Sequence, residues 1–230
     1  MSETQRPEYD EEEKQKFDEY YDFFSKLIRK TKRHTQSRKS INNFTRHLED
    51  KLGDGFPIDY VPDYLSQSNT LLFCSILYET DAFTMALLDA GADVNFVGDH
   101  WARTALLCAA QNIGEESDVD VFYRIAEKTK DIDATSTAGR TALSEVCANA
   151  AVYPMSVKYE FVRILLDFGA DPRPACDILD SYISSYNTDT GQLKKYVSKS
   201  SQKLKNYIVM YAAQMNNTKN SKEAGFDYEL

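Results

Sequence analysis

The residues that most often carry catalysis or bind metals are few in this chain and are not arranged for either task. Its three histidines are isolated from one another along the sequence: His34, His47 and His100. No metalloprotease, serine-hydrolase, phosphate-loop or dinucleotide-binding motif occurs. Cys108 and His100 could form a nucleophile–base pair, but core packing is the default for a cysteine in a helix. The acids Asp118 and Asp120 lack the spacing of a calcium loop. We therefore expect no enzymatic activity, no metal site and no cofactor.

The four cysteines are spread through the chain without any C-x-x-C pair: Cys74, Cys108, Cys147 and Cys176. This spacing disfavours zinc-ribbon and thioredoxin-like sites, and disulfide-stapled scaffolds are shorter and denser in cysteine. We interpret the cysteines as small buried side chains in a reducing compartment. The N-terminus lacks the pattern of a secretory signal peptide, and no apolar run is long enough to span a membrane. These observations predict a cytoplasmic protein without a transmembrane segment.

The formal net charge of −9 is distributed very unevenly along the chain. Residues 52–191 hold 22 acids and 8 bases, whereas residues 192–222 hold 7 lysines and no acid. A second basic segment, residues 26–51, holds 9 bases against 2 acids. An acidic body repels nucleic acid and attracts basic partners, so we expect a protein partner with a basic surface.

The basic stretch from Lys26 to Lys39 has three interpretations. It is a solvated helix end or a segment that packs on the acidic body, a nuclear-import signal, or a site for phosphate or lipid. The lysines of residues 194–222 carry the same ambiguity, although a groove for single-stranded nucleic acid would need more interleaved aromatic residues.

One sequence pattern occurs three times, beginning at Thr70, Thr104 and Thr141, which lie 34 and 37 residues apart. Each threonine precedes an apolar stretch, and a second apolar run follows in each copy. In the first and third copies this second run leads into Gly-Ala-Asp, at residues 91–93 and 169–171. A threonine hydroxyl satisfies backbone N–H groups at a helix start, and a glycine suits the position after a helix end. Each copy therefore predicts a pair of short helices, which must stack on neighbouring pairs to bury its apolar face.

This pattern resembles the ankyrin repeat, whose signature is T-P-L-H-x-A followed by a helix that ends in L-L-x-x-G-A-D-V-N, with a period of about 33 residues. The resemblance covers roughly residues 65–173 and implies an all-α fold. That fold is a short solenoid of stacked helix-turn-helix pairs with hairpin loops. The chain departs from the signature in lacking proline after the three threonines, in lacking glycine at 128–133, and in its longer loops at 113–120 and 150–158.

Helical caps are expected on both sides of the repeats, because apolar residues recur at helical spacing in 17–28, 41–52 and 193–215. An end repeat must cover its exposed apolar face. The predicted organisation has five parts: a disordered acidic tail (1–10), an N-terminal helical cap with a degenerate first repeat (11–64), three ankyrin-like repeats (65–173), a C-terminal helical cap (174–215) and a disordered tail (216–230).

Ankyrin-repeat proteins bind partners on the concave face made by the hairpin tips and the first helix of each pair, so the resemblance implies a partner-binding surface at the matching positions. Trp101 is the only tryptophan, and an exposed tryptophan beside arginine is typical of a binding hot spot. Packing of Trp101 against the neighbouring loops is the alternative. The expected surface comprises residues before the threonines and at the ends of the first helices: His100, Trp101, Arg103, Arg140, Tyr78, Gln111 and Asn112.

We therefore expect a non-enzymatic protein–protein interaction module: a monomeric adaptor, scaffold or regulatory binder that takes no small-molecule substrate. A microbial effector that acts in a host cell through the same binding mechanism is one alternative. A binder of nucleic acid or membrane surfaces through the basic flanks is another, and its nucleic-acid affinity would fall steeply with salt. An enzyme with an unrecognised terminal domain is a third, disfavoured because residues 1–60 and 174–230 look short and helical.

Overall fold

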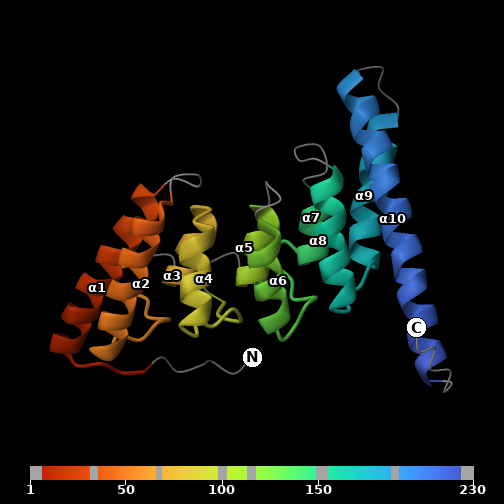
Figure 1. Ribbon diagram of the computed structural model, residues 1–230. Coiled ribbons are helices and arrows are strands. Elements are labelled where there is room, and N and C mark those ends of the chain that lie inside the picture. Colours follow the sequence, from red (N-terminus) through yellow and green to blue (C-terminus); the bar gives the residue numbers. More distant parts are fainter. Residues whose placement is uncertain are drawn as a thin grey trace. The chain divides into compact units, whose positions relative to one another are not determined.

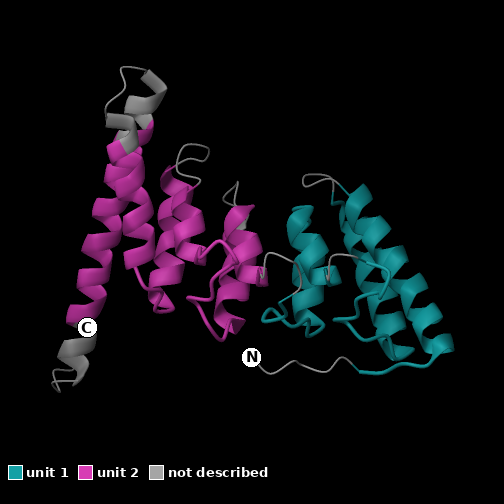
Figure 2. Cartoon of the chain, turned by 180° about the vertical axis from the view of Figure 1, so that it is seen from behind, with its two compact units in different colours: residues 1–100 teal, residues 101–230 magenta. Residues whose placement is uncertain are grey.

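The computed structural model describes residues 7–31, 36–65, 69–97, 103–112, 118–148, 155–187 and 192–223. Within these ranges the chain is all-α, with ten helices and no strand (Figure 1). The predicted all-α class is thereby confirmed for the part of the chain that the structure describes. The chain divides into two compact units, residues 1–100 and 101–230 (Figure 2).

Unit 1 is built from two helix pairs, α1 (Glu11–Lys30) with α2 (Arg38–Gly53), and α3 (Leu71–Leu77) with α4 (Asp81–Asp89). The first helices of the two pairs pack on each other, α1 on α3, and so do the second helices, α2 on α4. Aromatic residues make these contacts. The ring of Phe44 stacks on Phe83 with 4.1 Å between centroids, and the Tyr21 hydroxyl donates to the Asn69 carbonyl at 2.6 Å. Residues 11–53, expected in the cap region, thus form a helix pair of their own.

Unit 2 contains three helix pairs: α5 (Ala105–Gln111) with α6 (Asp118–Lys128), α7 (Ala142–Ala148) with α8 (Met155–Asp167), and α9 (Arg173–Asn187) with α10 (Gln192–Glu223). The first helices pack in the order α5, α7, α9, and the second helices in the order α6, α8, α10. Leu204 and Ile208 are fully buried apolar residues of α10, and Ser201 is fully buried beside them. This helix continues to Glu223, past the expected cap boundary at residue 215.

The repeated threonines start the first helices of three pairs, as the sequence predicts. The hydroxyl oxygen of each accepts a hydrogen bond from the backbone N–H three residues later: Thr70 from Phe73 at 3.3 Å, Thr104 from Leu107 at 3.3 Å and Thr141 from Ser144 at 3.2 Å. Each bond satisfies one of the N–H groups that a helix start leaves without an intrahelical partner.

Three second helices end in the same way, at glycines with positive φ: Gly55 (88°), Gly91 (93°) and Gly169 (89°). The N–H of the residue after each glycine donates to a carbonyl five residues earlier, in every case at 3.0 Å. This is the Schellman arrangement, which needs a left-handed residue and therefore favours glycine. Helix α3 ends through the same arrangement at Glu79, with φ 53°, where the sequence carries no glycine.

Within each unit, an aspartate carboxylate ties one helix pair to the next. The Asp59 carboxylate accepts the backbone N–H of Asp93 at 3.0 Å in unit 1, and the Asp133 carboxylate accepts that of Asp171 at 2.9 Å in unit 2. All four aspartates follow the end of a second helix. The segment without glycine still makes the same turn as the two Gly-Ala-Asp sequences: the Asp131 carboxylate accepts the N–H of Asp133, as Asp93 accepts that of Asn95 and Asp171 that of Arg173.

A test of the threonine caps uses Thr104. Thr104→Val keeps the side-chain shape but removes the acceptor for the Leu107 N–H, so we expect a loss of about 1–2 kcal/mol in the free energy of unfolding. Urea unfolding followed by circular dichroism measures this loss. Thr104→Ser retains the hydroxyl and should keep most of the parent's stability. A Thr104→Val protein as stable as the parent, beside a destabilised Thr104→Ser protein, would show that the methyl group and not the cap matters.

A lysine lies inside unit 2. The Lys158 side chain on α8 is only 1% exposed, and burial lowers its pKa to about 8, with a smaller opposing effect of the nearby Cys147. Burial disfavours the charged form because the ammonium loses its hydration. Between pH 8 and the unfolded pKa of about 10.4, the unfolded chain therefore holds a proton that the folded chain has released.

This proton linkage predicts a pH-dependent effect of Lys158→Met. The variant should be more stable than the parent at pH 7, by up to about 3 kcal/mol, because below pH 8 the folded parent must keep a buried charge. The difference should shrink as the pH rises toward 10, where both states of the parent hold neutral lysine. Unfolding curves of both proteins from pH 6 to 10 provide the measurement; a difference independent of pH would refute the assignment.

Candidate functional site

Four of the predicted binding residues lie around the first helices of unit 2. Arg103 directly precedes the cap residue Thr104, Gln111 is the last residue of α5 and Asn112 follows it. Arg140 stands in the same place before α7 as Arg103 does before α5. Tyr78 belongs to unit 1, at the end of α3. His100 and Trp101 lie outside the residues that the structure describes.

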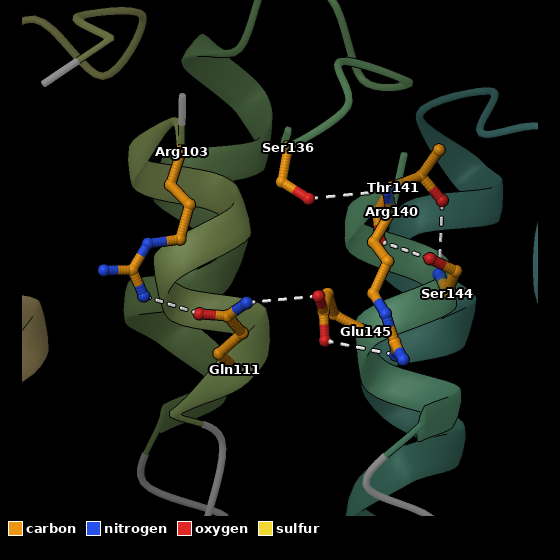
Figure 3. A network of polar contacts seen from close by, with 7 residues as sticks. All are labelled: Arg103, Gln111, Ser136, Arg140, Thr141, Ser144 and Glu145. Atoms are coloured by element: carbon orange, nitrogen blue, oxygen red, sulfur yellow. Dashed lines mark hydrogen bonds and ion pairs between the residues drawn. The ribbon is translucent and has the colours of Figure 1, made fainter. Parts of the chain in front are cut away.

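Three of these residues are joined into one network by Glu145 (Figure 3). The Arg103 guanidinium donates through Nη1 to Gln111 Oε1 at 2.6 Å. The Gln111 amide donates in turn to Glu145 Oε1 at 3.1 Å. The other carboxylate oxygen of Glu145 lies 3.8 Å from Arg140 Nη1. The network thus runs from α5 to α7. It links Gln111 and Glu145, which are 34 residues apart in the sequence.

The loop before α7 fixes the backbone of Arg140. Ser136 N–H donates to the Arg140 carbonyl at 3.0 Å, and Gly139 N–H donates to the Ser136 carbonyl at 2.8 Å. The Arg140 N–H donates to the Ser136 hydroxyl oxygen at 3.4 Å. Gly139 has a φ of 70°, which allows this tight turn. The tip of the loop, residues 137–139, is exposed.

Glu145 is the member of the network that the sequence analysis missed. It stands four residues after Thr141, where the other two copies have Cys74 and Cys108, and it is only 8% exposed. A carboxylate so placed must be hydrogen-bonded or paired to keep its charge. The Gln111 amide and the Arg140 guanidinium meet this requirement, and the position in the first turn of α7 adds the favourable field of the helix start. An acidic residue at a position where the other two copies have cysteine was the feature of the sequence that could have indicated this site.

Asn112 and Tyr78 are not part of this network. The Asn112 amide donates to the Cys108 carbonyl at 2.8 Å, so it caps the end of α5. Tyr78 is 44% exposed, and the Arg29 guanidinium of α1 lies 5.9 Å from its ring centroid. Tyrosine and arginine together are typical of binding hot spots. Unit 1 therefore holds a second, separate cluster of the predicted kind, made by Arg29 and Tyr78.

The network holds two guanidinium groups near one carboxylate, on an acidic part of the chain. Arg140 keeps 38% of its side chain exposed, so its guanidinium reaches solvent. Such an arrangement suits the recognition of a carboxylate or a carbonyl, since a guanidinium offers several N–H donors in fixed geometry. Among the described residues, no three potential ligands cluster as a metal site would require. None of the described helices combines the length and the apolar character needed to span a lipid bilayer.

Comparison with models of protein families gives no match for this chain, and neither does comparison with curated proteins.

A double-mutant cycle tests whether the network is an energetic unit. Gln111→Ala removes the amide donor from the buried Glu145 carboxylate, and we expect it to cost about 1–3 kcal/mol of unfolding free energy. In Gln111→Ala/Glu145→Ala, no carboxylate is left without its donor, so the two effects should not add. The expected coupling is about 1 kcal/mol, measured by urea unfolding of the parent, both single variants and the double variant. Additive effects would mean that the observed contacts do not stabilise unit 2.

Proposed function

We propose that this chain is a non-enzymatic protein-interaction module of the ankyrin-repeat type, which binds a protein partner through the Arg103–Gln111–Glu145–Arg140 network and the adjoining loop tip. The observation that carries the proposal is the network itself. It brings together residues that the resemblance assigns to the binding face, and it uses a buried carboxylate to hold two arginines at a partly exposed surface. A structural core has no need of this arrangement, because an apolar residue would fill the place of Glu145 at lower cost.

The repeat type has its own support. Three threonine caps, three glycine helix ends and two aspartate ties recur at equivalent places of successive helix pairs. These features match the positions of threonine, glycine and aspartate in the ankyrin signature.

The partner that fits this surface is a protein with a basic overall surface and a local acidic contact. The excess of acids in residues 52–191 attracts a basic partner over long range. The two arginines require the opposite charge at close range, so a carboxylate of the partner would fix its orientation. Trp101, two residues before Arg103 in the sequence, would supply an apolar anchor for the same partner.

The test compares partner capture by four proteins: the parent chain, Arg103→Gln/Arg140→Gln, Trp101→Ala and the control Arg46→Gln. Glutamine is chosen because glutamate at residue 140 would place a second carboxylate beside Glu145. Arg46 is exposed on α2 of unit 1 and takes part in none of the network's contacts. We expect the arginine pair and Trp101→Ala each to weaken binding by about 2 kcal/mol, while Arg46→Gln binds normally. Captured proteins are quantified by mass spectrometry, followed by binding isotherms with the purified partner.

A melting curve of each variant separates binding from folding. Trp101→Ala should change stability by no more than about 0.5 kcal/mol, as surface substitutions usually do. A Trp101→Ala protein that melts several degrees lower but binds normally would identify a packing residue. Normal binding by the folded Arg103→Gln/Arg140→Gln variant would overturn the proposed site.

A further inference from the structure

A second surface of the chain has the form of a docking groove and lies in unit 1. It is a hollow of about 570 Å³ between the two second helices, α2 and α4. Ile41 and Leu52 line one wall from α2, and Met85 and Ala86 line the other from α4; all four are partly exposed. An apolar hollow of this kind between adjacent helices accepts the side chains of another helix.

The charged residues of the groove are both acidic. Glu49 on α2 and Asp89 on α4 line it and are exposed to solvent, and no basic residue is among its lining residues. Glu49 follows Ile41 by eight residues on the same helix, so the two positions lie about 12 Å apart along the groove. A complementary occupant therefore presents an apolar side chain and a positive charge, separated by roughly two helical turns.

Helix α10 presents this combination. Its inner face, with Leu204 and Ile208, is buried against the rest of unit 2. Its outer face carries Lys199, Lys203 and Met210, all exposed, with Met210 53% accessible. Lys203 and Met210 are seven residues apart, so they lie on one side of the helix and about 10.5 Å from each other. Residues 192–222 contain seven lysines and no acid, so nothing on this helix before Glu223 opposes an approach to acidic residues.

We propose that the groove between α2 and α4 binds α10 of a second copy of this chain. Met210 enters the groove beside Ile41, and Lys203 pairs with Glu49. The two complementary surfaces lie on different parts of the chain, so the contact is head-to-tail and repeats from copy to copy. It uses neither Arg103 nor Arg140 and stands independently of the function proposed above. The resulting weak self-association departs from the monomer expected from the sequence.

Analytical ultracentrifugation over a range of chain concentrations tests the proposal with two variants. Glu49→Lys reverses the charge of the groove and leaves α10 intact. Lys203→Ala/Met210→Ala removes the positive charge and the apolar side chain that α10 presents, and leaves the groove intact. The parent chain should associate progressively with concentration, and less so at high salt. Each variant alone should associate at least about tenfold more weakly. An equimolar mixture of the two variants should form a one-to-one dimer and nothing larger. The intact α10 of the Glu49→Lys protein binds the intact groove of the Lys203→Ala/Met210→Ala protein, and the other two surfaces of that dimer are both altered.

Two controls alter exposed neutral residues on the same helices, Asn43→Ala on α2 and Gln202→Ala on α10, and should associate like the parent. A melting curve of each variant confirms that it is folded. A parent chain that stays monomeric at millimolar concentration overturns the proposal. A mixture that stays monomeric, or a Glu49→Lys protein that associates like the parent, also overturns it.

Discussion

The structure depends on one constraint: three of its helices are too short to exist alone. Helices α3, α5 and α7 have seven residues each, and six of the seven are buried in each case. An isolated helix of this length is not stable in water, because the cost of nucleation is spread over too few hydrogen bonds. Burial on nearly all sides also leaves almost no solvent face along the helix. Only the ends of these helices reach the surface. Arg103, just before α5, and Gln111, the last residue of α5, are therefore the residues available to a partner.

The parts of the fold that could be predicted from sequence are those in which one residue type meets one backbone requirement. Thr104 predicts a helix start because few other side chains accept the required N–H, and Gly91 predicts a helix end because it tolerates positive φ. The end of α3 was hidden, since Glu79 adopts the same conformation without being the residue type that favours it. The tie between Asp133 and Asp171 was also hidden, because it joins a carboxylate to a backbone group 38 residues away, which no local pattern records.

The candidate site shows a similar division. The places of Arg103, Gln111 and Arg140 could be predicted from the repeat register, because each lies at a fixed offset from a threonine. Their connection could not, because it runs through Glu145, a charged residue at a position where the other copies have a buried cysteine. Lys158, on α8 of the same unit, departs from apolar packing in a different way: burial lowers its pKa. One unit thus contains a buried acid that is hydrogen-bonded and paired with an arginine, and a buried base whose pKa is lowered by burial.

The aspartate ties also bear on how such a chain can change in length. The two tied pairs are separated by 34 residues in unit 1 and by 38 in unit 2, yet the bond lengths are nearly the same, 3.0 and 2.9 Å. The same hydrogen bond therefore joins successive helix pairs although the chain between its two ends differs in length by four residues. Insertions of a few residues are accommodated without moving the next pair, in the way that long surface loops are tolerated generally. This modularity permits a binding loop to grow or diversify while the scaffold beneath it keeps its geometry.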